Sequence, residues 1–220
     1  MIQKYLNSKV ILLFLILNTS LFIITLSLSF TILFRPFYYY HINYLKLEEE
    51  TNFSYNEIKT AYDDVIDYIV MNKPFKTGNL KFSVEGKNHF MDCKRLFKTN
   101  FIVLGISLAI LLLEIIILKN KNPLKHSIAF YSSCSILILF GSILFTTLII
   151  GFEKSFILFH KIFFLGKDNW LLDPNTDEII NILPEEYFKN CAILIITLII
   201  SISASIIIVE FLQRRKKINN

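Results

Sequence analysis

The 220-residue sequence has few of the residues and motifs on which many enzymes depend. It contains only six glycines, five prolines and three cysteines. An odd number of cysteines without a C-x-x-C pair supports neither a disulfide framework nor a zinc site. The sequence has no P-loop and no G-x-G-x-x-G, H-E-x-x-H or G-x-S-x-G motif. These absences leave ATP-driven or nicotinamide-dependent activity without support.

Charged residues are also scarce, at 19%, whereas 54% of the residues are hydrophobic. A soluble domain of this size cannot hide so many apolar side chains, and these residues fall in four long runs. Each run has the roughly 17–25 residues that a helix needs to cross a bilayer. Backbone groups inside lipid must bond within their own segment, which favours helix. The sequence therefore predicts an all-α membrane protein with four transmembrane helices, at about 10–34, 101–118, 127–152 and 191–209.

Basic residues gather at three flanks of these spans, and these flanks contain no Asp or Glu. By the positive-inside rule the three flanks face the cytoplasm, as do both termini. Two outer loops follow, at about 35–100 and 153–190, and we expect them to form an extracytoplasmic cap on a single membrane domain. The net charge of +5 then reflects topology and not nucleic-acid binding. The basic residues are Lys4, Lys9, Lys119, Lys121, Lys125, Arg214, Arg215, Lys216 and Lys217.

The first outer loop contains the signals of two helices. Ser54 and Glu57 form a capping-box pattern, which predicts an amphipathic helix through Asn72. Alternating apolar residues predict a short strand over 80–85, and Asn88 is expected to cap a helix that leads into the second span. His89, Asp92 and either Arg95 or Leu96 share one side of that helix.

The second outer loop begins with an apolar segment, Phe156–Leu165, which is too short to span a bilayer. It is either a helical extension of the third span or a segment that lies in the membrane interface. Gly166 is expected to end it, and Asp173-Pro174 predicts a turn.

Two histidines are the candidate functional residues, because His89 and His160 lie in different outer loops, each close to the expected membrane surface. A base and a positioning partner would fit this placement. Alternatively, each is an amphipathic side chain at headgroup depth. His41 and His126 are interpreted as structural. Trp170 is either an interfacial anchor or a residue that stacks on a ligand.

Four stretches resemble the lipoprotein intramolecular transacylases, integral membrane proteins of Gram-positive bacteria. The similarity covers nearly the whole chain in the same order. One departure is Cys93, where an apolar residue such as Val is expected, and this argues against Cys93 as a nucleophile. The stretches are YDDVIDYI (62–69), FSVEGKNHFMDCK (82–94), FHKIFFLG (159–166) and WLLDP (170–174).

The resemblance implies that an acyl chain moves from the sn-2 oxygen of a diacylglyceryl-cysteine lipoprotein to the α-amino group of the same cysteine. Converting an ester to an amide is downhill, so no cofactor or nucleotide is expected. His160 is the favoured base and His89 the oxyanion or leaving-group partner, although the opposite order stays open. The implied partners are the diacylated lipoprotein and membrane lipid, with an active site at the outer leaflet.

Further residues have subordinate roles in this hypothesis. Asp92 or Asp173 would orient an imidazole, as a carboxylate does in a triad. Arg95 and Trp170 are possible substrate contacts, and the segment Phe156–Leu165 would line acyl grooves.

Two other classes of protein compete with the transacylase. One is a non-catalytic membrane accessory or sensor protein that binds a partner through its outer loops, using the acidic face Asp63–Asp67. The other is a metallohydrolase with a zinc site formed by His89, His160, Asp92 and Asp173, although no paired H-x-x-x-H supports it.

Overall fold

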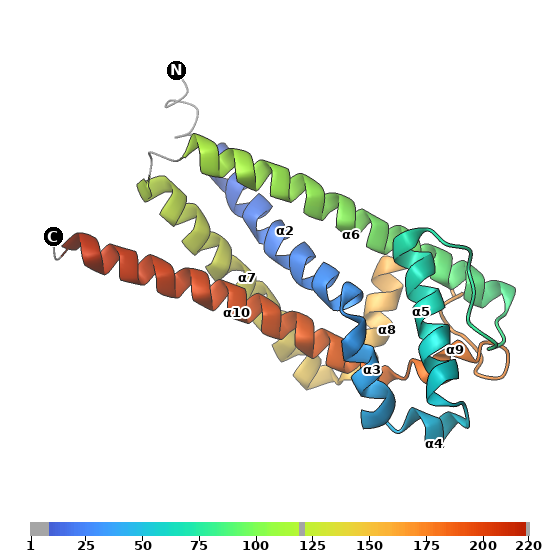
Figure 1. Cartoon of the computed structure of the whole chain (residues 1–220). Coiled ribbons are helices and arrows are strands. Elements are labelled where there is room, and N and C mark those ends of the chain that lie inside the picture. Colours follow the sequence, from blue (N-terminus) through green and yellow to red (C-terminus); the bar gives the residue numbers. More distant parts are fainter. Residues whose placement is uncertain (1–8, 119–121, 219–220) are drawn as a thin grey trace. The chain divides into compact units, whose positions relative to one another are not determined.

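The computed structural model describes residues 9–118 and 122–218, and within these ranges the chain is helical without named strands (Figure 1). The nine described helices are α2 (Lys9–Leu33), α3 (Arg35–Tyr44), α4 (Leu47–Thr51), α5 (Tyr55–Met71), α6 (Val84–Ile117), α7 (Asn122–Ile150), α8 (Phe152–Phe163), α9 (Ile179–Ile182) and α10 (Glu185–Ile218).

Four of these helices, α2, α6, α7 and α10, are long and apolar enough to cross a membrane. This confirms the predicted all-α class with four candidate spans. The 34 residues of α6 extend over roughly 51 Å, well beyond the roughly 30 Å of a bilayer core. Its charged residues, Glu114 apart, all precede Phe101, in keeping with a spanning segment that begins there. Which residues of each helix lie in lipid stays a prediction.

Part of the predicted orientation depends on residues that the structure does not describe. Lys4, Lys119 and Lys121 lie outside the described residues, as do the side chains of Lys125, His126, Arg214, Lys216 and Lys217.

The chain divides into two compact units. Unit 1 comprises residues 1–29, 101–146 and 194–220, and unit 2 comprises residues 30–100 and 147–193. The prediction of one membrane domain is not tested by this division.

Unit 1 is built from parts of the four long helices, which run alongside one another (Figure 1). Its buried core consists of Ile23, Ile136 and Ile199 from α2, α7 and α10. The amide of Asn18 donates to the Ser107 carbonyl at 3.2 Å, which joins α2 to α6. Apolar packing and a few such bonds therefore hold this unit together.

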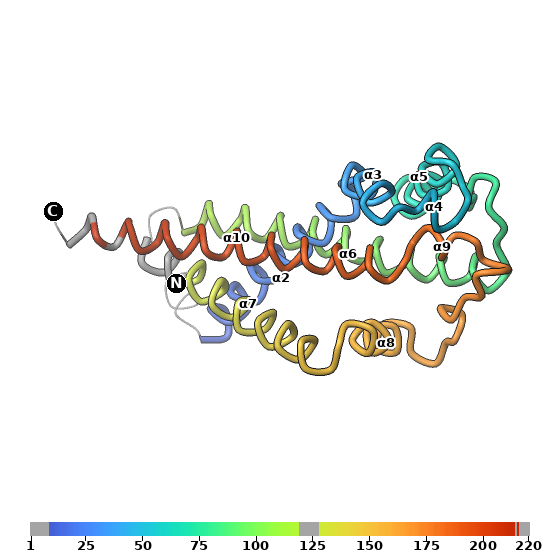
Figure 2. Tube along the Cα trace, turned by 90° about the horizontal axis from the view of Figure 1, so that it is seen from below, coloured from blue at the N-terminus to red at the C-terminus, as the bar shows by residue number. Residues whose placement is uncertain are grey.

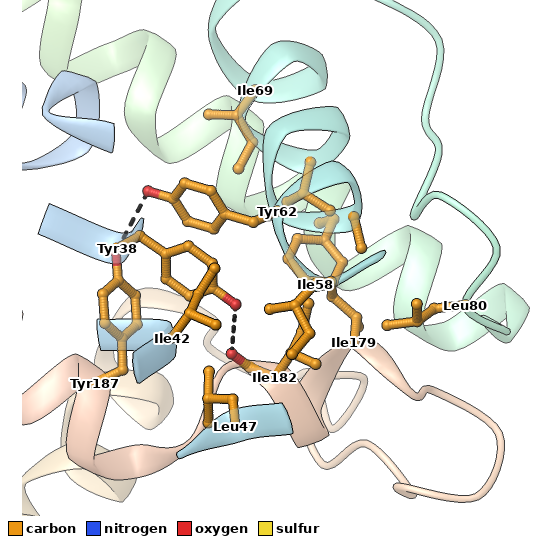
Figure 3. Packing of buried hydrophobic residues seen from close by; sticks show 13 residues of the cluster. Tyr38, Ile42, Leu47, Ile58, Tyr62, Ile69, Leu80, Ile179, Ile182 and Tyr187 are labelled. Carbon is orange, nitrogen blue, oxygen red and sulfur yellow. Dashed lines mark hydrogen bonds between the residues drawn. The ribbon is translucent and has the colours of Figure 1, made fainter. Parts of the chain in front are cut away.

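Unit 2 has a larger core, rich in tyrosine (Figure 3). The rings of Tyr38 and Tyr62 stack with centroids 3.7 Å apart. The Tyr38 hydroxyl donates to the Ile182 carbonyl at 2.8 Å, and the hydroxyls of Tyr62 and Tyr187 lie 3.4 Å apart. Within this unit α3, α4 and α5 lie on one side of the α6 and α10 segments and α8 lies on the other (Figure 2).

The helix α5 has the predicted capping box, in which Ser54 and Glu57 bond each other reciprocally. Its acidic face is paired within the chain. Asp63 accepts from Arg35 at 3.0 Å and from Lys59 at 2.6 Å, and Asp67 pairs with Arg35 and with Lys73. Asp63 and Asp67 are therefore already neutralised within the chain, which disfavours an accessory protein that binds a partner through this face.

The predicted strand over 80–85 is wrong, and so is the predicted start of the next helix at Asn88. Residues 80–83 are an irregular segment and α6 already begins at Val84. The cause lies far away in the sequence. Asp177 is buried and accepts from the backbone N–H of Ser83 at 2.8 Å and from its hydroxyl at 3.0 Å. This carboxylate from the second loop thereby anchors the chain just before α6.

Candidate functional site

The two candidate histidines meet in unit 2. His89 lies on the first part of α6 and His160 near the end of α8. Their ring centroids are 6.0 Å apart with an interplanar angle of 34°. Both side chains are buried, with exposed fractions of 9% and 8%. The structure therefore brings together two titratable side chains that are 71 residues apart in the sequence.

A backbone carbonyl sets the orientation of His160. Its Nδ1 lies 2.8 Å from the carbonyl oxygen of Phe156, one helical turn earlier. A carbonyl only accepts, so the neutral imidazole carries its proton on Nδ1 and presents a lone pair at Nε2. The ring also packs against Phe156 at 4.3 Å and Trp170 at 4.9 Å between centroids. Nε2 is thus suited to accept a proton.

His89 has different contacts. Its Nε2 lies 3.5 Å from the Cys93 sulfur, and its buried Nδ1 has no hydrogen-bond partner within the described chain. The Phe164 ring packs against it at 5.1 Å between centroids, nearly edge-on. Nδ1 is therefore the nitrogen of His89 whose hydrogen-bonding capacity no residue of the described chain uses.

Burial keeps both imidazoles neutral at neutral pH. It lowers the pKa of His89 to about 4, with a smaller contribution from His160 in the same direction and an opposing one from Asp92. Burial also lowers the pKa of His160, although the bond to the Phe156 carbonyl opposes this change. Burial raises the pKa of the Cys93 thiol to about 12, so this cysteine is not a ready thiolate.

Asp92 does not orient an imidazole as expected. Within the described chain it accepts from Lys167 at 2.6 Å, from Asn169 at 3.0 Å and from Arg95 at 3.3 Å. Burial works to raise the pKa of its carboxyl, but the bonds from Lys167 and Asn169 outweigh this and lower it. Asp92 thus ties the segment after α8 to α6, and the Phe156 carbonyl takes the orienting role.

The remaining sequence candidates divide between the site and its surroundings. Trp170 packs on His160, and its indole N–H donates to the Lys167 carbonyl at 3.0 Å. Arg95 lies at the edge of the site beside Asp92. Asp173 is exposed and accepts from Asn175 in the predicted turn, which closes with a 3.1 Å bond from Thr176 N–H to Asp173 O. Asp173 is therefore not brought to the histidines.

His41 is a useful contrast to the histidine pair. Its Nδ1 lies 2.6 Å from the Phe37 carbonyl and its Nε2 lies 3.1 Å from the amide of Asn190. Both nitrogens are engaged within the protein, which agrees with the structural interpretation.

The contacts of four further residues in this site were not predicted. Phe156 and Phe164 lie in the segment that was expected to line acyl grooves, but their packing on His160 was missed. They stand one turn before and one turn after His160, and this i, i+4 spacing was a usable signal. Lys167 and Asn169 have no such signal, because only the folded loop brings them to Asp92. In the described ranges no group of three or more His, Cys, Asp and Glu residues is arranged to hold a metal ion.

The fold and this site define a multi-pass membrane protein with a histidine pair enclosed by aromatic rings. Comparisons with known proteins identify the family. A search of curated proteins finds no significant match, but the family model of the lipoprotein intramolecular transacylase Lit matches residues 12–188.

Solved structures agree with that match. The membrane-integral lipoprotein intramolecular transacylase Lit from Bacillus cereus is 28% identical, over 96% of this chain and 98% of its own, with a TM-score of 0.87. Two structures of that protein with one histidine replaced, by arginine or by alanine, are 26% and 27% identical with TM-scores of 0.82. Each of these two matches extends over 96% of this chain, and over 94% and 96% of the respective solved chain.

The chain belongs to the family of lipoprotein intramolecular transacylases, and it is a membrane acyltransferase that acts on lipoproteins.

Proposed function

We propose that His160 and His89 catalyse the movement of the sn-2 acyl chain of a diacylglyceryl-cysteine lipoprotein to the α-amino group of the same cysteine. The observation that carries this proposal is the pair of neutral, buried histidines whose rings lie 6.0 Å apart. The product has an N-acyl group and a free 2-hydroxyl on the glyceryl moiety. Donor and acceptor belong to one molecule, so the reaction is an isomerisation without a co-substrate.

His160 acts as the base. A free α-amine has a pKa of about 7.7–8.0, so a fraction of it is uncharged at neutral pH and can attack. As the nitrogen of this uncharged amine bonds to the ester carbon, Nε2 of His160 takes one of its two protons. When the tetrahedral intermediate collapses, the bond from the acyl carbon to the sn-2 oxygen breaks. The imidazolium of His160 then returns the proton to that oxygen, and the enzyme is restored.

His89 acts as a hydrogen-bond donor to the developing oxyanion. A neutral imidazole can donate without giving up its proton, and burial keeps His89 in this form. A preorganised donor in a water-poor site is worth far more than in water. The substrate oxygen would satisfy Nδ1, which has no partner in the described chain.

The aromatic enclosure supports the same reaction. Intramolecular attack closes a ring of about eight atoms, so that positioning contributes much of the rate. Phe156, Phe164 and Trp170 surround the histidines and would hold the ester and the amine together while they exclude water.

We further propose that both termini are cytoplasmic and that the site faces the outer leaflet, on the basis of the basic flanks. Single cysteines placed at Lys46 and at Arg215, in a chain without its three native cysteines, test this orientation. A charged thiol reagent that does not cross the membrane should label the first and not the second in intact cells. The opposite labelling pattern contradicts the orientation.

Mass spectrometry of a lipoprotein tests the reaction itself. The protein would be expressed in a bacterium whose own lipoproteins are diacylated with a free α-amine. The total mass stays constant, so fragmentation must locate the chains. One chain on nitrogen and one on glycerol, absent with His160→Ala, supports the proposal. Both chains on glycerol, with the enzyme present in the membrane, overturns it.

A further inference from the structure

A groove runs along α6 beside the histidine pair, entirely within unit 2. Its volume is about 360 Å³, and its apolar part is formed by two walls. The first wall, on α6, consists of Leu96, Thr99 and the stem of Arg95; the second, at the end of α8 and just after it, consists of Phe163, Phe164 and Leu165.

One end of the groove lies next to the catalytic histidines, across the ring of Phe164. Phe164 belongs to its wall, and the ring of Phe164 lies 5.1 Å from His89 and 5.6 Å from His160 between centroids. From His89 to Thr99 is ten residues of one helix, or roughly 15 Å. The groove therefore begins beside the reaction centre, behind the Phe164 ring, and follows α6 toward the apolar half of that helix, which starts at Phe101.

The walls suit a hydrocarbon chain. Phe163 and Leu165 are exposed by 52% and 81%, so large apolar surfaces line the groove. Thr99 donates its hydroxyl to the Arg95 carbonyl at 2.9 Å, so that no unsatisfied donor is presented there. The aliphatic stem of Arg95 can cover a lipid while its guanidinium stays near Asp92.

The polar end of the groove fixes the spacing of its walls. Asp92 on α6 is only 7% exposed and binds Lys167 at 2.6 Å and Asn169 at 3.0 Å. These bonds attach the segment that follows α8 to α6 at the end nearest the histidines. A glyceryl ester, which is polar, fits this end better than the apolar end.

We infer that this groove binds the acyl chain that is transferred, the sn-2 chain of the lipoprotein, with its carbonyl at the histidine pair and its hydrocarbon along α6. The inference rests on the proposed function. The carbonyl under attack must lie at the histidines, and the chain continuous with that carbonyl passes the Phe164 ring into the adjacent groove. The retained sn-1 chain leaves the glyceryl group at another carbon and has no such constraint.

Mixed-chain lipopeptides test the inference. Two synthetic substrates carry either a palmitoyl group at sn-2 and an octanoyl group at sn-1, or the reverse. Thr99→Trp narrows the groove beyond Leu96, at a distance from the histidines. We expect it to lower kcat/KM for the sn-2 palmitoyl substrate, relative to the sn-2 octanoyl substrate, by about tenfold or more.

Lys98→Trp is the matched control, because it adds the same ring at the neighbouring exposed position, which does not line the groove. It should leave the ratio of the two kcat/KM values unchanged. If Thr99→Trp leaves the ratio unchanged, or instead penalises the substrate with palmitoyl at sn-1, the inference is overturned. Absence of N-acylation by the wild-type enzyme on both substrates would instead contradict the proposed function.

A second measurement does not depend on a variant. A lipopeptide with a photoreactive group midway along the sn-2 chain is irradiated with the wild-type protein in lipid vesicles. Crosslinks to peptides that contain Leu96–Thr99 or Phe163–Leu165 support the inference. Crosslinks to these peptides from a probe on the sn-1 chain, and not from one on the sn-2 chain, overturn it.

Discussion

The two units of this protein use polar side chains in different ways. In unit 1 the hydroxyls of Ser20 and Ser27 donate to carbonyls one turn earlier in their own helix, and the bonds that Asn18 and Ser132 make to another helix end on backbone carbonyls. In unit 2, polar side chains join segments far apart in the sequence, as Asp177 does with Ser83 and Asp92 with Lys167. Much of unit 1 thus requires only apolar residues of adequate length, whereas unit 2 depends on particular partners.

The largest expected effect distinguishes the two catalytic histidines of unit 2 from the structural His41. His89→Gln and His160→Gln should each lower turnover by about 10²–10⁴-fold, the usual contribution of a positioned acid or base. Fragmentation mass spectrometry of a lipoprotein measures this loss. His41→Gln should keep turnover within a few-fold while lowering the melting temperature, because both nitrogens of His41 bond the protein. Equal losses in all three variants would contradict the distinction.

A smaller effect is expected at Asp92. Asp92→Asn removes the charge that holds Lys167 and Asn169, so the site loosens, and a misplacement of about 1 Å can lower a rate by about 10²-fold. We expect kcat/KM to fall by about tenfold to a hundredfold. Asp173→Asn, at the exposed turn, should change it by less than about twofold. A larger loss of kcat/KM in Asp173→Asn than in Asp92→Asn would instead identify Asp173 as the functional carboxylate.

Substituting one glycine in each unit compares directly how tightly the two units are packed. A Cβ added at Gly86 in unit 2 would lie 2.0 Å from Oδ1 of Asp177, whereas one at Gly105 in unit 1 would meet no atom of the described residues within 4 Å. Gly86→Ala should therefore destabilise the protein by about 1–3 kcal/mol. Gly105→Ala should be neutral or stabilise its helix by up to about 1 kcal/mol. Melting temperatures in detergent measure both, and equal shifts would refute the comparison.

The smallest expected effect is a change in how the free energy of unfolding depends on pH. The pKa of His89 falls from 6.5 to about 4 on folding, so the unfolded chain binds the proton first as pH falls. The stability contributed by the neutral side chain is complete above pH 6.5 and declines toward pH 4. Between about pH 6.5 and 5.5 the wild type should lose about 1 kcal/mol more than His89→Gln. Parallel pH curves for the two proteins would show that His89 is not buried as described.

Hydropathy alone predicted the all-α class and the four long helices, and the capping pattern of Ser54 and Glu57 predicted α5. These features depend on short stretches of sequence, and lipid leaves helix as the available backbone structure. The prediction of a strand over 80–85 was wrong for the converse reason. Its alternating pattern is local, but the bonds from Ser83 to Asp177 bridge 94 residues and decide the conformation.

The candidate site divides in the same way. The sequence by itself determined that two histidines stand in separate outer loops, and that Phe156 and Phe164 flank His160 at helical spacing. Only the tertiary structure decided that the two imidazoles lie 6.0 Å apart, that Asp92 binds Lys167 and not a histidine, and that Asp173 stays away from both. The physical reason is that hydropathy and capping act over a few residues, whereas ring contacts and burial depend on which distant segments pack together.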